Sequence, residues 1–338
     1  MIAAAFEAAA ADPPRPPPMG WGPEDVRSAC AWVADRAAAV RIDLDAIERL
    51  AQHIAPTLPS PPVYDDTLHF RGEAAATLAF VLCLDAVNFG SGYFPHLAKR
   101  EGHSGYGTLA SRLADRFHTS GAWTAADLTS LTPSDLRALL RQRPGNWAID
   151  ELMARYASSL QQLGRWIGAA YAGSFERLVT ASDRSAIKLA RRLSTCPAFS
   201  DCPRYDGRSI PLLKRAQIAA WDLYLAFAGH GPGALDDIGC LTAFADNVVP
   251  HALRIEGVLH YANELARRID TGELLGAGSE EEIELRACSV HAVELLAERI
   301  RQMGHHVYPA LIDYILWNRP RDDRFRSLPR HRTRTTAY

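Results

Sequence analysis

The sequence predicts an all-α protein that folds as a single compact domain. Apolar residues recur three and four positions apart along most of the chain, for example at Val26, Ala29 and Val33, which is typical of helices with one buried face. Helix-starting residues precede several of these stretches, such as Thr-Pro-Ser-Asp at 132–135. No stretch alternates polar and apolar residues between turn signals, as a strand would.

The predicted elements follow from where helical periodicity starts and stops. The Pro-rich residues 1–19 are expected to form a mobile arm of polyproline character, and residues 20–338 the helical domain. Proline and glycine clusters, such as those at 56–62 and 196–209, interrupt the pattern. Helices are therefore predicted from residue 23 and at 44–54, 72–87, 106–117, 124–130, 133–141, 147–171, 175–180, 184–193, 211–227, 237–246, 249–256, 261–270, 280–303 and 309–318.

Composition limits the classes of function. The chain has 338 residues, 48% of them apolar and 22% charged, with a formal net charge of −2, which argues against a protein that grips long nucleic acid. The six cysteines lack zinc-ligand spacing, so we predict reduced thiols and no metal or cofactor. We find no targeting segment, and the longest apolar run, 74–84, is too short for a membrane span. A cytoplasmic location is predicted.

The predicted helix at 211–227 has an unusual face. Lys214, Gln217 and Trp221 lie three or four residues apart on one side, with Asp222 beside them. An ordinary amphipathic helix with Lys214 in water is one interpretation. A functional surface is the other, because this mixture suits neither a core stripe nor a plain solvated face.

Asp246 lies where one predicted helix stops and Pro250 begins the next. It can simply cap the second helix. It can also be a catalytic carboxylate, because Phe244 and Val249 beside it would keep it partly out of water. The sequence leaves both interpretations open.

Other features carry weaker signals. His291, within the 280–303 helix, is expected to be a packing residue, while Asp313 and Trp317 lie four residues apart on the last helix. The arginine-rich tail from residue 319 would ordinarily be frayed. Motifs of metalloproteases, serine hydrolases and phosphate-binding loops do not occur.

Several blocks, taken in order over about residues 70–338, resemble the queuosine salvage protein family. The blocks are Asp85-Ala-Val-Asn-Phe89, Lys214-Arg-Ala-Gln-Ile218, Leu241-Thr-Ala-Phe-Ala-Asp246 followed by Val249-Pro250, Glu284-Leu-Arg-Ala-Cys-Ser289, Asp313-Tyr-Ile-Leu-Trp317, and His331-Arg-Thr-Arg334 with Tyr338. The chain departs from the family pattern at Gly90–Pro95, Asn247, Val248, His251 and Asn318.

The resemblance implies an all-helical fold related to helix-hairpin-helix DNA glycosylases. It also implies an enzyme that hydrolyses the N-glycosidic bond of queuosine 5′-monophosphate, or of a related 7-deazaguanine nucleotide, and releases queuine for salvage. The partner would be a small nucleotide, without a membrane or a stable nucleic acid complex. The alternatives are a non-catalytic protein that binds a modified nucleoside or base, and a DNA-lesion glycosylase, against which the charge of −2 weighs.

Glycoside cleavage passes through a sugar cation, which a carboxylate can stabilise while it activates water. Asp246 is the candidate. A 7-deazapurine has carbon in place of N7, so protonation there cannot assist departure of the base. The predicted substrate-binding residues are Asn88, Gln217, Asp222 and Asp313 for the base edge, Phe89, Trp221, Phe244 and Trp317 for stacking, Lys214, Arg330, His331 and Arg332 for the 5′-phosphate, and His251 beside Pro250.

Overall fold

The computed structural model describes residues 19–58, 62–319, 323–326 and 328–338. These residues form helices joined by loops and very short strands, so the predicted all-α class is confirmed. Except for Met19, the predicted arm at 1–19 lies outside the described residues. Across the described ranges, no helix combines the length and the apolarity that a bilayer span requires.

The helices lie close to their predicted positions. In chain order they are α1 (Pro23–Ala34), α2 (Leu44–Ile54), α3 (Ala74–Ala86), α4 (Gly105–Ser120), α5 (Ala125–Ser130), α6 (Pro133–Leu139), α7 (Trp147–Tyr171), α8 (Phe175–Ala181), α9 (Ala186–Leu193), α10 (Lys214–Ala226), α11 (Val249–Ile255), α12 (Asn263–Asp270), α13 (Glu280–Gln302) and α14 (Pro309–Asn318). Short 3-10 turns include η4 (Ile238–Cys240) and η6 (Asp323–Arg326).

Three pairs of short strands join segments that are mostly distant in sequence. The pairs are β1 (Val40–Ile42) with β4 (Leu259–Tyr261), antiparallel; β2 (Arg204–Tyr205) with β3 (Arg208–Ser209), antiparallel; and β5 (Leu274–Leu275) with β6 (Arg332–Thr333), parallel. Strands of two or three residues are too short to produce a detectable period of two, which is why the sequence did not reveal them.

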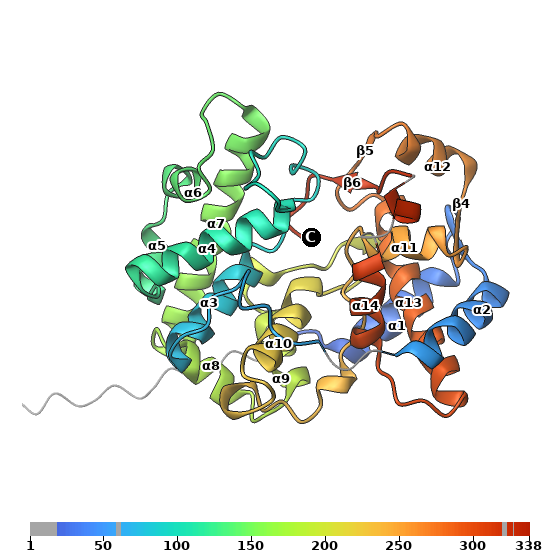
Figure 1. The fold of residues 1–338 in the computed structure, drawn as a ribbon, viewed down its shortest axis with the longest axis horizontal. Coiled ribbons are helices and arrows are strands. Elements are labelled where there is room, and N and C mark those ends of the chain that lie inside the picture. Colours follow the sequence, from blue (N-terminus) through green and yellow to red (C-terminus); the bar gives the residue numbers. More distant parts are fainter. Residues whose placement is uncertain (1–18, 59–61, 320–322, 327) are drawn as a thin grey trace, which may run out of the picture.

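The helices form two groups with α10 between them (Figure 1). Helices α3 to α8 make one group, while α1, α2 and α11 to α14 make the other. The N-terminal helix α1 packs against α13, and α10 packs against α3. The second group is therefore built from both ends of the chain, so helices far apart in sequence must meet to complete it.

Helix α3 is buried on all sides, as its apolar composition predicted. Every residue from Thr77 to Ala86 is buried. Asp85, the only charged residue of this helix, is 0% exposed. A carboxyl group in such surroundings is costly unless it is paired, neutralised or used.

The predicted helix at 237–246 is wrong. Only the single turn η4 forms there, and the segment after it is irregular. Its backbone groups bond instead to buried side chains: the Thr242 N–H donates to Gln217 Oε1 at 2.9 Å, and the Phe244 N–H donates to Asp313 Oδ2 at 2.8 Å. These tertiary hydrogen bonds replace the helical ones, since a buried N–H must find some acceptor.

The tail at 331–338 is packed into the molecule, so the expectation of a frayed end is also wrong. His331 and Tyr338 are buried. The Gly90 N–H donates to the Tyr338 carbonyl at 3.0 Å, and Asn247 Nδ2 donates to the His331 carbonyl at 3.0 Å. The tail thereby connects the loop after α3 with the start of α11 (Figure 1).

Candidate active site

Lys214, the first residue of α10, lies at the centre of a buried polar cluster. It is 5% exposed, so the interpretation that placed it in water is wrong. Its ammonium donates to the Asn88 carbonyl at 3.1 Å and to Asn88 Oδ1 at 3.2 Å. Burial lowers the pKa of Lys214, while the charges of Asp246 and Asp85 oppose that change.

Asn88 is oriented from its other side by Asp85. Asn88 Nδ2 donates to Asp85 Oδ1 at 3.2 Å, which leaves the amide oxygen of Asn88 for Lys214. Among the described residues, Asp85 Oδ2 is buried without a hydrogen-bond partner. Burial raises the pKa of Asp85 well above its usual value, and the charge of Asp222 adds to the shift.

Asp246 caps helix α11 with one of its oxygens. Oδ1 accepts from the backbone N–H of Val248 at 2.7 Å and of Val249 at 3.1 Å. No hydrogen bond from the described part of the chain reaches Oδ2. Capping therefore occupies half of the carboxylate, and the side chain remains 8% exposed.

An acidic and aromatic wall stands next to Asp246. Asp313, on α14, is 4% exposed and holds the Phe244 N–H. Burial raises the pKa of Asp313 well above its usual value, and the charge of Asp246 adds to the shift. The Phe244 ring lies 6.3 Å from that of Trp221, which contacts Tyr308 at 5.8 Å between ring centroids. Aromatic rings at this place suit a flat heterocyclic ligand.

Asp222 lies on α10 among further aromatic side chains. Burial raises its pKa to about 7. Burial also raises the pKa of Tyr106 and of Tyr64, and in both cases the charge of Asp222 contributes. The Tyr106 ring centroid is 6.3 Å from that of Trp317, and its hydroxyl is 2.9 Å from His69 Nε2. Electrostatic coupling of this kind requires the groups to be near one another.

Three of the residues predicted to bind phosphate, Arg330, His331 and Arg332, come from the tail. Of these, Arg330 interacts electrostatically with Asp246. The side chain of Arg330 as a whole is exposed, but desolvation of its guanidinium lowers its pKa, and the charge of Asp246 opposes that change. Arg332 donates to the Gly272 carbonyl at 2.7 Å. His331 lies 3.2 Å from the Tyr338 hydroxyl, and burial lowers its pKa to about 3, so it is neutral at pH 7.

Other predicted residues lie behind the cluster and hold its frame. Phe89 packs against Tyr156 with ring centroids 4.9 Å apart. Gln217 Nε2 donates to Thr242 Oγ1 at 2.8 Å, in addition to accepting the Thr242 N–H. His251 Nε2 lies 2.7 Å from a backbone carbonyl in η6. The structure therefore brings Asn88, Lys214, Asp222, Phe244, Asp246 and Asp313 near one another, with Trp221 against Phe244. Arg330 is linked to them through the charge of Asp246, and Trp317 through its contact with Tyr106.

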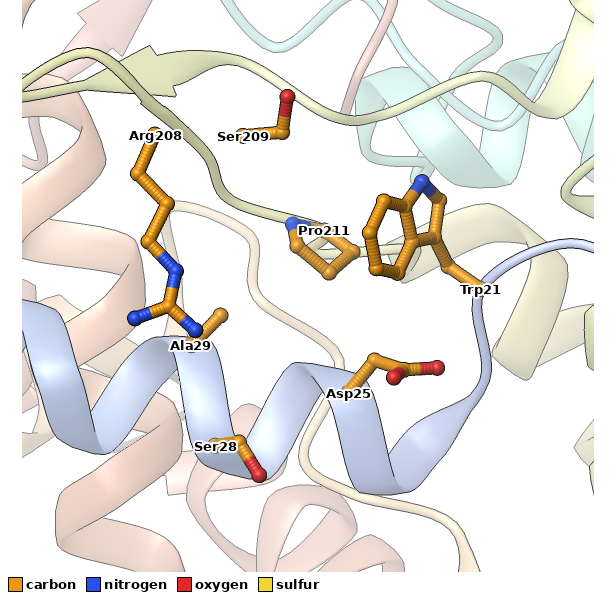
Figure 2. Close-up of a pocket in the computed structure, with 7 residues that line it drawn as sticks. All are labelled: Trp21, Asp25, Ser28, Ala29, Arg208, Ser209 and Pro211. Carbon is orange, nitrogen blue, oxygen red and sulfur yellow. The ribbon is translucent and has the colours of Figure 1, made fainter.

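Two surface pockets lie apart from this place. One, of about 230 Å³, is lined by Trp21, Asp25, Ser28, Ala29, Arg208, Ser209 and Pro211 (Figure 2). None of the predicted site residues lines it. The other has a volume of about 370 Å³ and includes His69 in its lining. His69 is the residue whose Nε2 lies 2.9 Å from the Tyr106 hydroxyl. In the described ranges, no group of three His, Cys, Asp or Glu side chains could hold a metal ion.

Three residues of the cluster escaped the sequence analysis. Asp85 stood in a quoted block without a role, although one acid at the end of a wholly apolar helix is a recognisable signal. Tyr64 and Tyr106 had no such signal, because they belong to a loop and to α4, far from α10 in sequence. Only the packing of these elements brings them to Asp222.

Comparison with known proteins gives consistent matches. Residues 68–338 match the family model described as queuosine salvage protein. A protein of Sphaerobacter thermophilus named queuosine 5′-phosphate N-glycosylase/hydrolase is 35% identical over 311 residues, covering 90% of this chain and 95% of that protein. Proteins of the same name from Mus musculus and Bos taurus are each 29% identical, over 343 and 336 residues, and cover 94% and 92% of this chain and 99% and 98% of their own.

Proposed function

The chain belongs to the queuosine salvage protein family, and we propose that it is an N-glycosyl hydrolase that releases queuine from queuosine 5′-phosphate. The three relatives described above, which have this name, match nearly the whole of both chains. The observation that carries the chemistry is that Asp246 caps α11 through Oδ1 alone. Its Oδ2 accepts no hydrogen bond from the described residues, and its charge acts on the buried Lys214.

In the proposed reaction, water attacks C1′ of the ribose while the bond from C1′ to the base nitrogen breaks. The bonding electrons leave with the base, which takes up a proton at a ring nitrogen, and the water gives up a proton to Asp246. The carboxylate also stabilises the positive charge that develops on the sugar. Base and ribose 5-phosphate are the products. Because carbon replaces N7 in the base, charge stabilisation by Asp246 matters more here than for a purine.

The roles proposed for binding follow from the surroundings of Asp246. Asn88 and Asp313 present polar groups for the guanine-like edge, while Phe244 and Trp317 flank the ring. Arg330 is the proposed partner of the 5′-phosphate, because it is exposed and close enough to Asp246 to feel its charge.

The function is tested with a panel of 7-deazaguanine nucleosides and their 5′-monophosphates, with mass spectrometry of the released bases. We expect queuine to appear from queuosine 5′-phosphate, and more slowly from the nucleoside, which lacks the group proposed to bind Arg330. Tight binding of the nucleotide without release of any base would favour the alternative, a non-catalytic binding protein.

Asp246→Asn tests the catalytic assignment. The amide oxygen of Asn can still accept from Val248 and Val249, so we expect normal folding and substrate binding. The kcat should fall about 10²–10³-fold, because the charge that stabilises the sugar cation is lost. Base release by chromatography and the melting temperature are the two measurements.

Asp43→Asn is the matched control for that variant. Asp43 caps α2 in the same way, accepting from the Ala46 N–H at 2.8 Å, on a different part of the molecule. Its replacement should leave kcat unchanged. Equal turnover by wild type and Asp246→Asn would show that Asp246 is only a cap.

A further inference from the structure

Arg286 of α13 is a buried cation that bonds to the segment carrying Asp246. Its side chain is 1% exposed, and its Nε donates to the Ala245 carbonyl at 2.9 Å. Ala245 directly precedes Asp246, so this bond fixes the peptide group from which the catalytic side chain extends. The reaction proposed above assigns no step to Arg286, so its purpose has to be found in what it holds.

The guanidinium of Arg286 is fixed in one orientation by its other contacts. Nη1 and Nη2 donate to the two carboxylate oxygens of Asp201, at 3.0 and 2.7 Å, and Glu282 Oε1 lies 3.5 Å from Nη1. The Tyr338 ring stacks on the guanidinium, with its centroid 4.9 Å from Cζ. A two-pronged pair and a stacked ring together restrict how a planar group can turn. The Nε–H is therefore directed at Ala245.

Asp201 extends the same arrangement to the start of α10. Its Oδ2 accepts the backbone N–H of Lys214 at 3.1 Å, and its carbonyl accepts the N–H of Leu212 at 3.0 Å. Leu213, between these two, has a left-handed backbone with a φ of 52°, a conformation that surrounding contacts must stabilise. Asp201 thus fixes the first turn of α10, from which the Lys214 side chain extends.

The buried charges of Arg286 and Asp201 need a reason beyond stability. The cost of taking two charges out of water can exceed their attraction, and apolar replacements of buried pairs are often neutral or stabilising. What apolar side chains cannot supply is directed hydrogen bonds. The two bonds that leave this pair end on the backbone at Ala245 and Lys214, so each fixes one polar residue of the site.

We propose that Arg286 is a positioning residue for Asp246, and that together with Asp201 it sets where the catalytic carboxylate lies relative to Lys214. The proposal rests on the function proposed above. The other anchors of this segment, on Gln217 and Asp313, act farther back in the chain. Arg286 alone among these three holds the residue adjacent to Asp246.

The first test is Arg286→Lys, which keeps a positive charge near Asp201 but loses the planar fork and the Nε–H. The kcat for queuosine 5′-phosphate, measured per folded molecule, should fall about 10–100-fold, because a displacement of about 1 Å in a catalytic group can have that effect. KM should change little, because no residue proposed to contact the substrate is removed. A wild-type kcat in this variant would overturn the proposal.

Arg254→Lys is the matched control. Arg254, in the last turn of α11, donates to both carboxylate oxygens of Asp270 at 2.7 and 2.9 Å, and its Cζ lies 4.9 Å from the centroid of the Tyr261 ring. It therefore makes the same kind of pair and ring contact without a bond to Ala245. Its replacement should leave kcat unchanged.

The double variant Arg286→Met with Asp201→Leu separates position from stability. It leaves no lone buried charge, so it should be more stable in urea than Arg286→Met alone. Its kcat should nevertheless fall about 10–100-fold, because the directed bonds to Ala245 and Lys214 are lost. A stable double variant with wild-type kcat would show that the pair serves the fold only, and would overturn the proposal.

A double-mutant cycle with Asp246→Asn shows whether Arg286 acts through Asp246. In that background Arg286→Lys should lower kcat far less than in wild type, because the charge that it places is already gone. The same fold-change in both backgrounds would overturn the positioning role and leave the glycosylase function standing. Absence of base release by the wild-type protein would instead remove the proposed function, and this role with it.

Discussion

Asp246 illustrates how one side chain can stabilise a helix and remain able to meet a substrate. The sequence placed it at a helix junction and left the choice between a cap and a catalyst open. The structure shows that Oδ1 alone makes the capping bonds, so the two interpretations do not compete. No spacing pattern could have revealed this, because it depends on which oxygen faces the N–H groups of α11.

His331 is predicted to make the protein sensitive to mild acid. Burial lowers its pKa from 6.5 to about 3 in the folded protein, so the unfolded chain binds the proton more readily. The stability that comes from neutral His331 is therefore complete above about pH 6.5 and is lost as the pH falls toward 3. At pH 5 the loss should reach about 2 kcal/mol, from 1.36 kcal/mol per pH unit.

The measurement is urea unfolding of wild type and His331→Gln between pH 5 and pH 7.5. The variant should lose less stability on acidification than wild type does, whatever its absolute stability. His96→Gln, at an exposed position, is the control and should behave as wild type does. Parallel pH profiles for wild type and His331→Gln would contradict the prediction.

At the scale of elements, the site depends on segments that are neither helix nor sheet. The irregular segment after η4 is fixed by hydrogen bonds from its backbone to Gln217 and Asp313, and Asp246 lies at its end, just before α11. The tail packs beside the loop after α3, where Gly92 approaches Thr333 closely. These two segments together carry Phe244, Asp246 and Arg330, so a change in either should disturb the site.

Gly92→Ala is predicted to displace the tail. An added Cβ would overlap the Thr333 carbonyl, which is backbone and cannot rotate away. We expect a loss of about 1–3 kcal/mol in the free energy of unfolding together with a raised KM, because Arg330 precedes the displaced segment. Urea unfolding and steady-state kinetics measure the two effects.

Gly168→Ala is the matched substitution. Gly168 lies within α7, and an added Cβ there meets nothing within 4 Å. The variant should be unchanged or more stable by up to about 1 kcal/mol, since Ala favours helix more than Gly does. Equal stability of the two variants would show that the tail can yield without cost.

At the scale of the whole molecule, a buried ion pair joins α13 to the loop before α10. Arg286 Nη2 lies 2.7 Å from Asp201 Oδ2, and both side chains are 1% exposed. Asp201 also accepts the Lys214 backbone N–H at 3.1 Å. Arg286 donates in addition to the Ala245 carbonyl at 2.9 Å, next to Asp246. The pair therefore links the start of α10, where Asp201 accepts from Lys214, to the segment before Asp246, where Arg286 donates to Ala245.

Asp201→Ala should destabilise the protein by about 3–5 kcal/mol, because it leaves the buried guanidinium of Arg286 without its main partner. The surface pair of Arg184 with Asp236, whose side chains are 65% and 67% exposed, provides the control. Asp236→Ala should leave the unfolding midpoint nearly unchanged, since solvent screens that pair. Similar midpoints for the two variants would mean that Arg286 finds another acceptor.

The sequence by itself determined the all-α class and most helix positions, because apolar periodicity and caps act over a few residues. Helix α7, predicted at 147–171, has those bounds in the structure. The blocks at 85–89, 214–218 and 241–246 also indicated the family, and most of their polar residues belong to the cluster. Periodicity, capping and short motifs depend only on residues close together in the chain, so these features could be predicted.

Only the tertiary structure decided which of these residues meet. The predicted helix at 237–246 gave way to bonds from Gln217 and Asp313, and the tail that should have frayed became buried. The hydrogen bonds that join Asp85, Asn88 and Lys214 require α3 to pack against α10 across more than a hundred residues of chain. Such contacts arise from the burial of distant apolar faces against each other, which no spacing within one segment records.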